Sequence, residues 1–118
     1  MGNRAVIDMD GKTGIYLHWN GDETSVASFL QVAKDYKLRP SDEDNYGTAR
    51  FVQIISNFFG GGLSIGVGDL TSLEDMQDGD QKYVISNWEL EERNVLPNPE
   101  MVAEIHRVND QFFLQEGA

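Results

Sequence analysis

The chain has 118 residues, of which 20 are Asp or Glu and nine are Lys or Arg, so its formal net charge at pH 7 is −11. This length is typical of a single domain, residues 1–118, and a content of 40% apolar residues argues against a disordered acidic tail. Cysteine is absent, which excludes disulfides, thiolate metal sites and a cysteine nucleophile. A pI near 4.3 leaves too few basic side chains for phosphate contacts, so we expect no direct binding to nucleic acid or to an anionic membrane surface.

Two strands joined by a tight turn are predicted near the N-terminus, over residues 4–9 and 14–20. Apolar and polar residues alternate along both segments, as they do in half-buried strands. Asp10-Gly11 between them is a hairpin signal, because glycine tolerates the positive φ of a tight turn. Trp19 shares the apolar face of the second strand, so we expect it to fill the core from one end of the sheet and Trp88 from the other.

Two helices are predicted next. The first is capped by Asp22 or Thr24 and runs to about residue 38, with one apolar stripe. The second spans residues 46–59 and is apolar on more than one side, so it should be the most buried element. Three glycines at 60–62 end it, because glycine readily adopts the left-handed conformation that follows a helix.

The C-terminal part is predicted to contain two strands and a helix. Residues 63–67 and 83–91 form the strands, with a bulge near Ser86, and residues 69–80 form an acidic loop between them. Asn98 and Pro99 supply an N-cap and a first helical residue for the last helix. The order β-β-α-α-β-β-α predicts a single α+β domain in which helices pack on an antiparallel four-stranded sheet.

The negative charge is concentrated in one part of the sequence. Residues 1–68 have a net charge of −2, whereas residues 69–104 carry ten acidic side chains against Lys82 and Arg93. Asp75, Asp78 and Asp80 offer oxygen ligands, as do Asp8 and Asp10, but neither group has the regular spacing of a calcium-binding loop. We therefore expect no metal site and no cofactor.

The sequence offers little material for catalysis. The two histidines, His18 and His106, stand apart, and neither belongs to a zinc-binding or nucleophile motif. Carboxylate pairs are numerous, but an acidic chain contains such pairs by chance. We therefore expect the protein not to be an enzyme.

A polar stripe on the second predicted helix is the main alternative site. Tyr46, Arg50, Gln53 and Asn57 recur at spacings of four, three and four, so they share one face. If Tyr16 and His18 of the second strand met this stripe, Arg50 could hold an anion in a polar pocket. A pocket of this kind, formed by Tyr16, His18, Arg50 and Asn57, would bind or sequester a small anionic ligand. The competing interpretation is that the stripe faces solvent, or that Arg50 pairs with an acid of the chain.

Five short segments together resemble a family of small phage and prophage proteins. They are GNRAVI (residues 2–7), GIYLHWNG (14–21), YGTAR (46–50), NFFGG (57–61) and SIGVG (64–68). The resemblance covers about the first 90 residues and departs from the family pattern at Asp22-Glu23 and at residues 78–81. It implies a phage setting inside a bacterial host cell, and no particular activity.

The phage setting points to a role for the acidic side chains of residues 69–104. Small acidic phage proteins often bind and block host defence machinery, in some cases by imitating the charge of DNA. The phage setting together with the acidity therefore leads us to expect a non-catalytic inhibitor of a nucleic-acid-targeting defence system, of the anti-CRISPR or antirestriction type, whose partner is a basic nucleic-acid-binding host protein or complex. We expect the binding surface to be formed by Asp75, Asp78, Asp80, Glu89, Glu91 and Glu92. A phage housekeeping or assembly role, with an apolar self-association surface, remains the third interpretation, and the sequence does not predict the oligomeric state.

Overall fold

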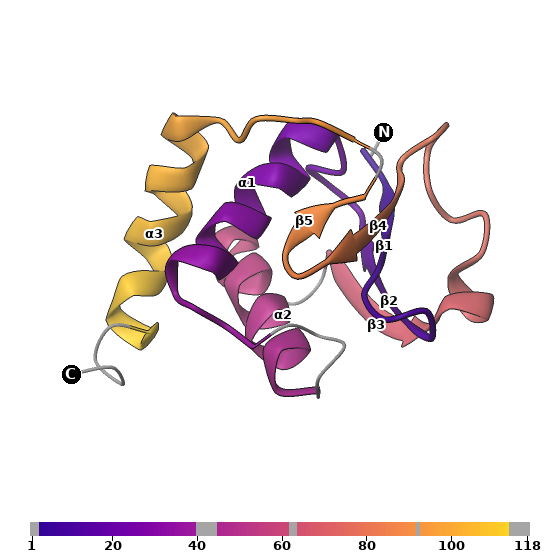
Figure 1. The fold of residues 1–118 in the computed structure, drawn as a ribbon, viewed down its shortest axis with the longest axis horizontal. Helices are drawn as coiled ribbons and strands as arrows, with labels where there is room; N and C mark the ends of the chain where they lie inside the picture. Colours follow the sequence, from indigo (N-terminus) through magenta and orange to yellow (C-terminus); the bar gives the residue numbers. More distant parts are fainter. Residues whose placement is uncertain (1–2, 40–44, 62–63, 92, 114–118) are drawn as a thin grey trace.

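The computed structural model of the protein describes residues 3–39, 45–61, 64–91 and 93–113, and it shows an α+β domain (Figure 1). The elements in chain order are β1 (Ala5–Asp8), β2 (Thr13–Leu17), α1 (Glu23–Asp35), α2 (Asn45–Phe59), β3 (Ile65–Asp69), the 3-10 helix η1 (Leu70–Leu73), β4 (Lys82–Ser86), β5 (Glu89–Leu90) and α3 (Pro99–Phe113). The α+β class and the three helices were predicted from the sequence.

The sheet differs in detail from the four-stranded antiparallel sheet that the sequence predicted. It has five strands in the order β3-β2-β1-β4-β5, and β1 pairs with β4 in parallel, with Ile7 opposite Tyr83. The other three pairings are antiparallel. The parallel pairing arises because the segment after β3 crosses one face of the sheet before β4 begins, so β4 enters from the same end as β1.

The strand predicted over residues 83–91 is a hairpin of β4 and β5. Asn87 and Trp88 form its two-residue turn, with φ values of 53° and 62°. Positive φ at both central residues is the geometry of a type I′ turn, whose twist matches that of the strands it joins. The expected bulge near Ser86 is therefore a complete reversal of the chain.

Trp88 is buried in the core, as predicted, and Trp19 is not. Trp88 is 3% exposed, its Nε1 donates to the Leu38 carbonyl at 3.0 Å, and its ring lies 5.1 Å from that of Phe51. These contacts hold a bulky residue in a left-handed conformation that it rarely adopts. Trp19 is 44% exposed because β2 ends at Leu17, so the alternation of faces that predicted its burial stops before it.

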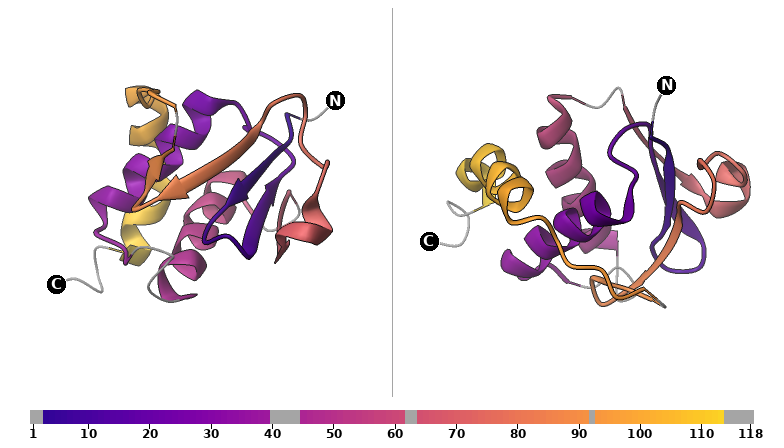
Figure 2. Two further views of the ribbon diagram at one scale, coloured as in Figure 1. Left: turned by 45° about the vertical axis from the view of Figure 1, so that its right-hand side comes forward. Right: turned by 90° about the horizontal axis from the view of Figure 1, so that it is seen from above.

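The helices cover one face of the sheet (Figure 2). The core between them contains Ile7, Ile15 and Leu17 from the sheet together with Phe29 of α1 and Phe51 of α2. As predicted, Asp22 caps α1 by accepting from the Ser25 amide, and glycines end α2. Two bonds close α2, from Gly60 N–H to Asn57 O and from Gly61 N–H to Ser56 O, which is the Schellman pattern.

The opposite face of the sheet, here called the outer face, is crossed by residues 70–80, the segment predicted to be an acidic loop (Figure 2). Leu73 is buried against glycines of β2 and β3. A Cβ on Gly14 would come within 2.8 Å of the Leu70 side chain and 3.0 Å of the Leu73 side chain. The segment is fixed at its far end by Asp78, whose amide donates to the Arg4 carbonyl and whose carboxylate pairs with the Arg4 guanidinium at 2.8 Å.

Helix α3 lies on the side of α1 and α2 that faces away from the sheet (Figure 1). Asn98 caps it as predicted, accepting from the Glu100 amide at 2.9 Å. Asn109 is fully buried, and its side chain donates to the Ile54 carbonyl at 3.2 Å and accepts from Asn57 at 2.8 Å. A satisfied polar contact therefore fixes α3 against α2.

We predict that Tyr83→Phe lowers the free energy of unfolding by about 1–3 kcal/mol. The Tyr83 hydroxyl donates to the buried Gly21 carbonyl at 2.6 Å, and removing a donor leaves that carbonyl unpaired. Burial raises the pKa of Tyr83 to about 12, so the hydroxyl keeps its proton at neutral pH. Urea denaturation measures the change. Tyr16→Phe, a matched variant on the outer face, should cost less than about 0.5 kcal/mol.

Candidate functional site

Four carboxylates are spread along one end of the sheet, where β1, β3 and β4 end and β2 begins. Asp8 ends β1, Asp10 lies in the β1–β2 turn, Asp69 ends β3 opposite Thr13, and Glu91 follows β5. We call these four residues the acidic end of the sheet. Among the residues that the structure describes, none of the four makes an ion pair, so no basic side chain within these residues neutralises them.

The two aspartates of the β1–β2 turn are held by backbone amides. Asp8 Oδ1 accepts from Gly11 N–H at 2.7 Å, and Asp10 Oδ1 accepts from Lys12 N–H at 3.0 Å and Thr13 N–H at 2.7 Å. Asp side chains commonly stabilise turns in this way. The sequence predicted the turn, but the carboxylates were considered there only as metal ligands. The structure shows that they fix their own position.

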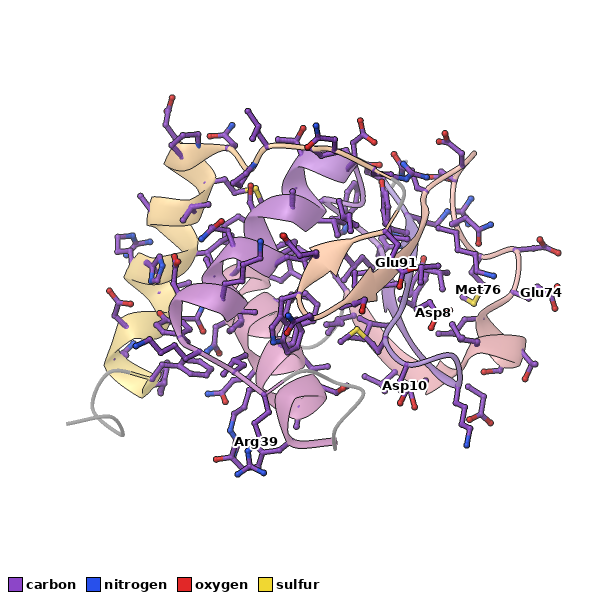
Figure 3. All side chains as sticks on the ribbon, viewed as in Figure 1. Asp8, Asp10, Arg39, Glu74, Met76 and Glu91 are labelled. Atoms are coloured by element: carbon purple, nitrogen blue, oxygen red, sulfur yellow. The ribbon has the colours of Figure 1, made fainter. Side chains whose placement is uncertain are left out.

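Asp8, Asp10 and Glu91, which are labelled in Figure 3, line an open depression of about 230 Å³. Val84 of β4 also lines it and is 41% exposed, so an apolar side chain lies among the carboxylates. Two chain contacts bring these residues together, since Asp8 pairs with Val84 in the parallel register and Glu91 N–H donates to the Val84 carbonyl at 2.9 Å. An apolar centre with a charged rim is the usual composition of a protein-binding surface.

The acidic residues predicted to form the binding surface are not gathered into one surface. Asp75, Asp80 and Glu91 are exposed and make no ion pair within the described ranges. Asp78 is neutralised by Arg4, whose hydrogen bonds hold the pKa of Asp78 below its usual range. Glu89 pairs with Lys34 of α1. Glu92 lies outside the described residues.

Part of the acidity also falls outside the described part of the chain. Five of the 20 acidic residues are in this group, and they are Asp42, Glu43, Asp44, Glu92 and Glu116. Near the acidic end, Glu74 and Asp75 follow η1 on the segment that crosses the outer face, and Met76 beside them is 38% exposed (Figure 3). Sequence reasoning missed Asp8, Asp10 and Asp69 as members of this surface, because only the pairing of the strands places them at the same end of the sheet as Glu91.

The four residues of the predicted small-ligand pocket are not brought together. The Tyr16 hydroxyl bonds to His18 Nδ1 at 2.9 Å on the outer face, whereas Arg50 lies on α2 with its guanidinium 3.9 Å from the centre of the Tyr46 ring. Asn57 bonds to Asn109 between α2 and α3. The sheet therefore separates Tyr16 and His18 from the other two. In the described part of the chain, no three His, Asp or Glu side chains are grouped so as to hold a metal ion.

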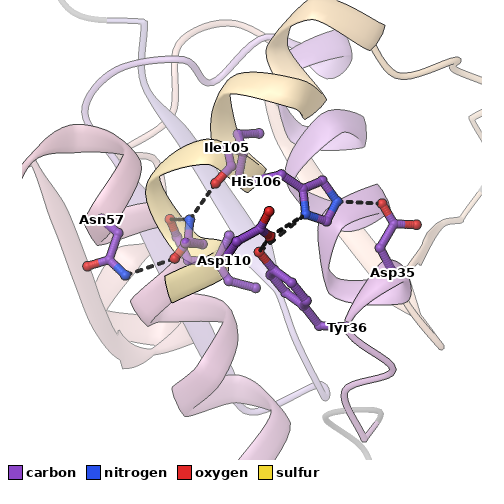
Figure 4. Close-up of polar contacts among 8 residues, drawn as sticks. Asp35, Tyr36, Asn57, Ile105, His106 and Asp110 are labelled. Carbon is purple, nitrogen blue, oxygen red and sulfur yellow. Dashed lines mark hydrogen bonds and ion pairs between the residues drawn. The ribbon is translucent and has the colours of Figure 1, made fainter. Parts of the chain in front are cut away.

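A cluster of polar side chains lies between α1 and α3 (Figure 4). His106 Nε2 lies 2.8 Å from Asp35 Oδ2, and its Nδ1 lies 3.0 Å from Asp110 Oδ1, which also accepts from the Tyr36 hydroxyl at 2.6 Å. Phe113 stacks on the Tyr36 ring at 4.6 Å. Both ring nitrogens of His106 are engaged by carboxylates, so this cluster joins two helices and leaves no ring nitrogen for a reacting group.

Protonation of His106 should stabilise the packing of α3. Burial lowers the pKa of His106, but hydrogen bonds to Asp35 and Asp110 outweigh it and raise this pKa above 6.5. A raised pKa in the folded state gives a stabilisation that is complete below pH 6.5 and is lost as the pH rises through the folded value. Hydrogen bonds from Tyr36 and His106 lower the pKa of Asp110, so its own contribution is present above about pH 3.8.

We predict that His106→Gln removes about 1 kcal/mol of unfolding free energy at pH 5.5 and much less at pH 9. The reason is that glutamine cannot supply the positive charge between the two carboxylates. Urea denaturation of both proteins at pH 5.5, 7 and 9 measures the difference. His18→Gln, which leaves the contacts between α1 and α3 intact, serves as the matched control for the substitution itself. A constant difference between His106→Gln and the wild type at all three pH values would contradict the prediction.

Comparisons of the chain with protein-family models, with curated proteins and with solved structures found no match. None of the described helices is long and apolar enough to cross a membrane.

Proposed function

We propose that this protein is a non-catalytic binding protein whose acidic end of the sheet docks on a basic surface of a nucleic-acid-binding protein. The observation that carries the proposal is the set of four carboxylates that make no ion pair within the described residues, Asp8, Asp10, Asp69 and Glu91, which come from three separate segments of the chain. Carboxylates concentrated in this way attract a basic partner and hasten association, and the resulting complex weakens as salt rises.

The position of the basic side chains supports the same proposal. Arg4, Lys34, Arg93 and Arg107 are each paired with a carboxylate that is not a member of the acidic end, and Arg93 and Lys82 line a second depression with Glu91. Lys12 at the tip of the β1–β2 turn is the exposed base nearest to the acidic end in sequence. These four ion pairs therefore neutralise carboxylates elsewhere and none at the acidic end of the sheet.

Rigid placement adds to the support. Asp8 and Asp10 are fixed by three backbone amides, so little side-chain freedom is lost when a partner binds them. A DNA-binding groove presents Lys and Arg to a fixed array of phosphates, and fixed carboxylates can satisfy the same side chains. Together with the resemblance to phage proteins, this leads us to propose an inhibitor of a bacterial nucleic-acid-targeting defence system, acting in the host cell by occupying a DNA-binding groove.

We predict that Glu74→Lys together with Glu91→Lys weakens partner binding about tenfold or more. The double variant reverses two exposed charges, Glu91 at the depression and Glu74 after η1, without touching the turn aspartates that hold the backbone. Glu100→Lys with Glu104→Lys on α3 changes the net charge equally and should leave binding unchanged. The immobilised proteins are exposed to bacterial lysate at 50 and 500 mM salt, and the recovered proteins are identified and their nuclease activity is assayed with and without the chain.

The proposal requires three results together. Nucleic-acid-binding proteins are recovered by the wild type at low salt and lost at high salt, their nuclease activity falls when the chain is added, and the Glu74/Glu91 variant fails where the α3 variant succeeds. Equal recovery by the two variants would show that total charge, and not the acidic end, determines binding. Salt-independent recovery would exclude charge as the basis of recognition. Circular dichroism of both variants shows whether they remain folded.

A further inference from the structure

Strand β3 forms one edge of the sheet, and no described segment pairs with its free side. At the other edge, β5 and the Glu91 amide cover β4. The bonds from His18 N–H to Ser64 O and from Leu70 N–H to Lys12 O fix the alternation along β3. In an antiparallel pair successive residues turn their backbone groups to opposite sides, so Ile65, Val67 and Asp69 direct theirs away from β2.

Over residues 65–68, the free edge of β3 lacks the charged side chains, prolines and bulges with which proteins usually block strand addition. Residues 65–68 contain no charged residue and no proline, and β3 pairs with β2 in unbroken register. Val67 is 55% exposed. The Asp69 carbonyl accepts from Ser72 Oγ at 2.8 Å, so the open backbone groups are those of Ile65 and Val67.

Gly66 keeps the outer face of β3 open without being required by the fold. Its φ is not positive, and a Cβ built on it would meet only the Tyr16 side chain, at 3.8 Å, which is ordinary van der Waals contact. Gly68 differs, since a Cβ there would lie 3.2 Å from Ser72 Oγ. A side chain from a neighbouring strand could therefore lie over Gly66 and contact the Tyr16 ring.

We propose that β3 binds an extended basic segment of a partner protein, which adds a sixth strand to the sheet beside Ile65 and Val67. This inference rests on the proposed function, because it specifies how the chain binds its basic partner. Main-chain hydrogen bonds give such strand addition its affinity, and alternate side chains give its specificity.

The net charge of the chain distinguishes between the possible binding partners of the free edge of β3. A second copy of this chain would bring another net charge of −11 to the same edge. A basic segment instead places Lys or Arg near Asp69, which ends β3, and near Asp10 in the adjacent turn. The occupant that fits is an extended segment with apolar residues toward Val67 and basic residues among the rest.

The test uses the full chain and a blocked heptapeptide of alternating lysine and valine. Amide hydrogen exchange of the protein is followed by NMR at peptide concentrations up to about 1 mM. We expect exchange of the Ile65 and Val67 amides to slow at least threefold, whereas the amides of Gly66 and Gly68, which point toward β2, do not change. A peptide of equal charge with N-methylated valines, which cannot donate from those residues, should have no such effect.

Several results would overturn the inference. Unchanged exchange at Ile65 and Val67 would do so, as would equal protection by the N-methylated peptide, which would show electrostatic attachment alone. If Ile65 and Val67 are already protected in the free protein and it sediments as a dimer, a second copy occupies the edge. Val67→Pro removes one outward donor and should abolish protection at Ile65, while Val67→Thr should preserve it.

This test is independent of the lysate experiment. If the Glu74/Glu91 charge reversal abolishes partner capture but the peptide protects neither amide, the acidic end binds the partner and β3 does not. If the peptide protects both amides and charge reversal leaves capture unchanged, strand addition holds and the charge-based function fails.

Discussion

Burial of β1 on both faces is the constraint on which the rest of the structure depends. Ala5 and Ile7 face the helices, whereas Val6 points to the outer face, and all three are at most 1% exposed. A sheet covered by helices on one face alone would leave Val6 in water. The segment after β3 therefore crosses the outer face, is fixed by the Arg4–Asp78 contact, and delivers β4 parallel to β1. Ala5-Val6-Ile7 is an unbroken apolar run, which is the sequence signature of such a strand, so the alternation predicted for residues 4–9 is wrong within these three residues.

This constraint explains which parts of the fold could be predicted from the sequence. The helices could, because caps such as Asp22 and Asn98 and end signals such as Gly60 act on neighbouring residues. Strand pairing could not be predicted, because it depends on the path that residues 70–80 take across the sheet. The packing of Leu73 on Gly14 shows that path, and this contact is visible only in the structure. The type I′ turn at Asn87 and Trp88 was missed because tryptophan seldom adopts a left-handed conformation, and its burial in the core compensates for that strain.

The candidate site shows the same division between local and long-range information. The excess of acidic residues after residue 68 is visible in the sequence, but two of the six residues chosen there, Asp78 and Glu89, are neutralised by bases distant in the chain. The structure instead places Asp8 and Asp10 at the acidic end, and these two residues belong to residues 1–68, whose net charge is only −2. Ion pairs and strand register both join residues more than 50 positions apart, and a charge count along the chain contains neither.

The unneutralised charge and the free strand edge meet at Asp69. This residue ends β3 and belongs to the acidic end, so a segment added along β3 would run directly into the carboxylates of the β1–β2 turn. Exposed ion pairs contribute little to stability, and Asp10 serves the turn through its contacts with backbone amides. The fold therefore does not need a base at this end. Leaving the carboxylates unpaired costs the domain little, and it makes them available to a basic partner held by the neighbouring edge.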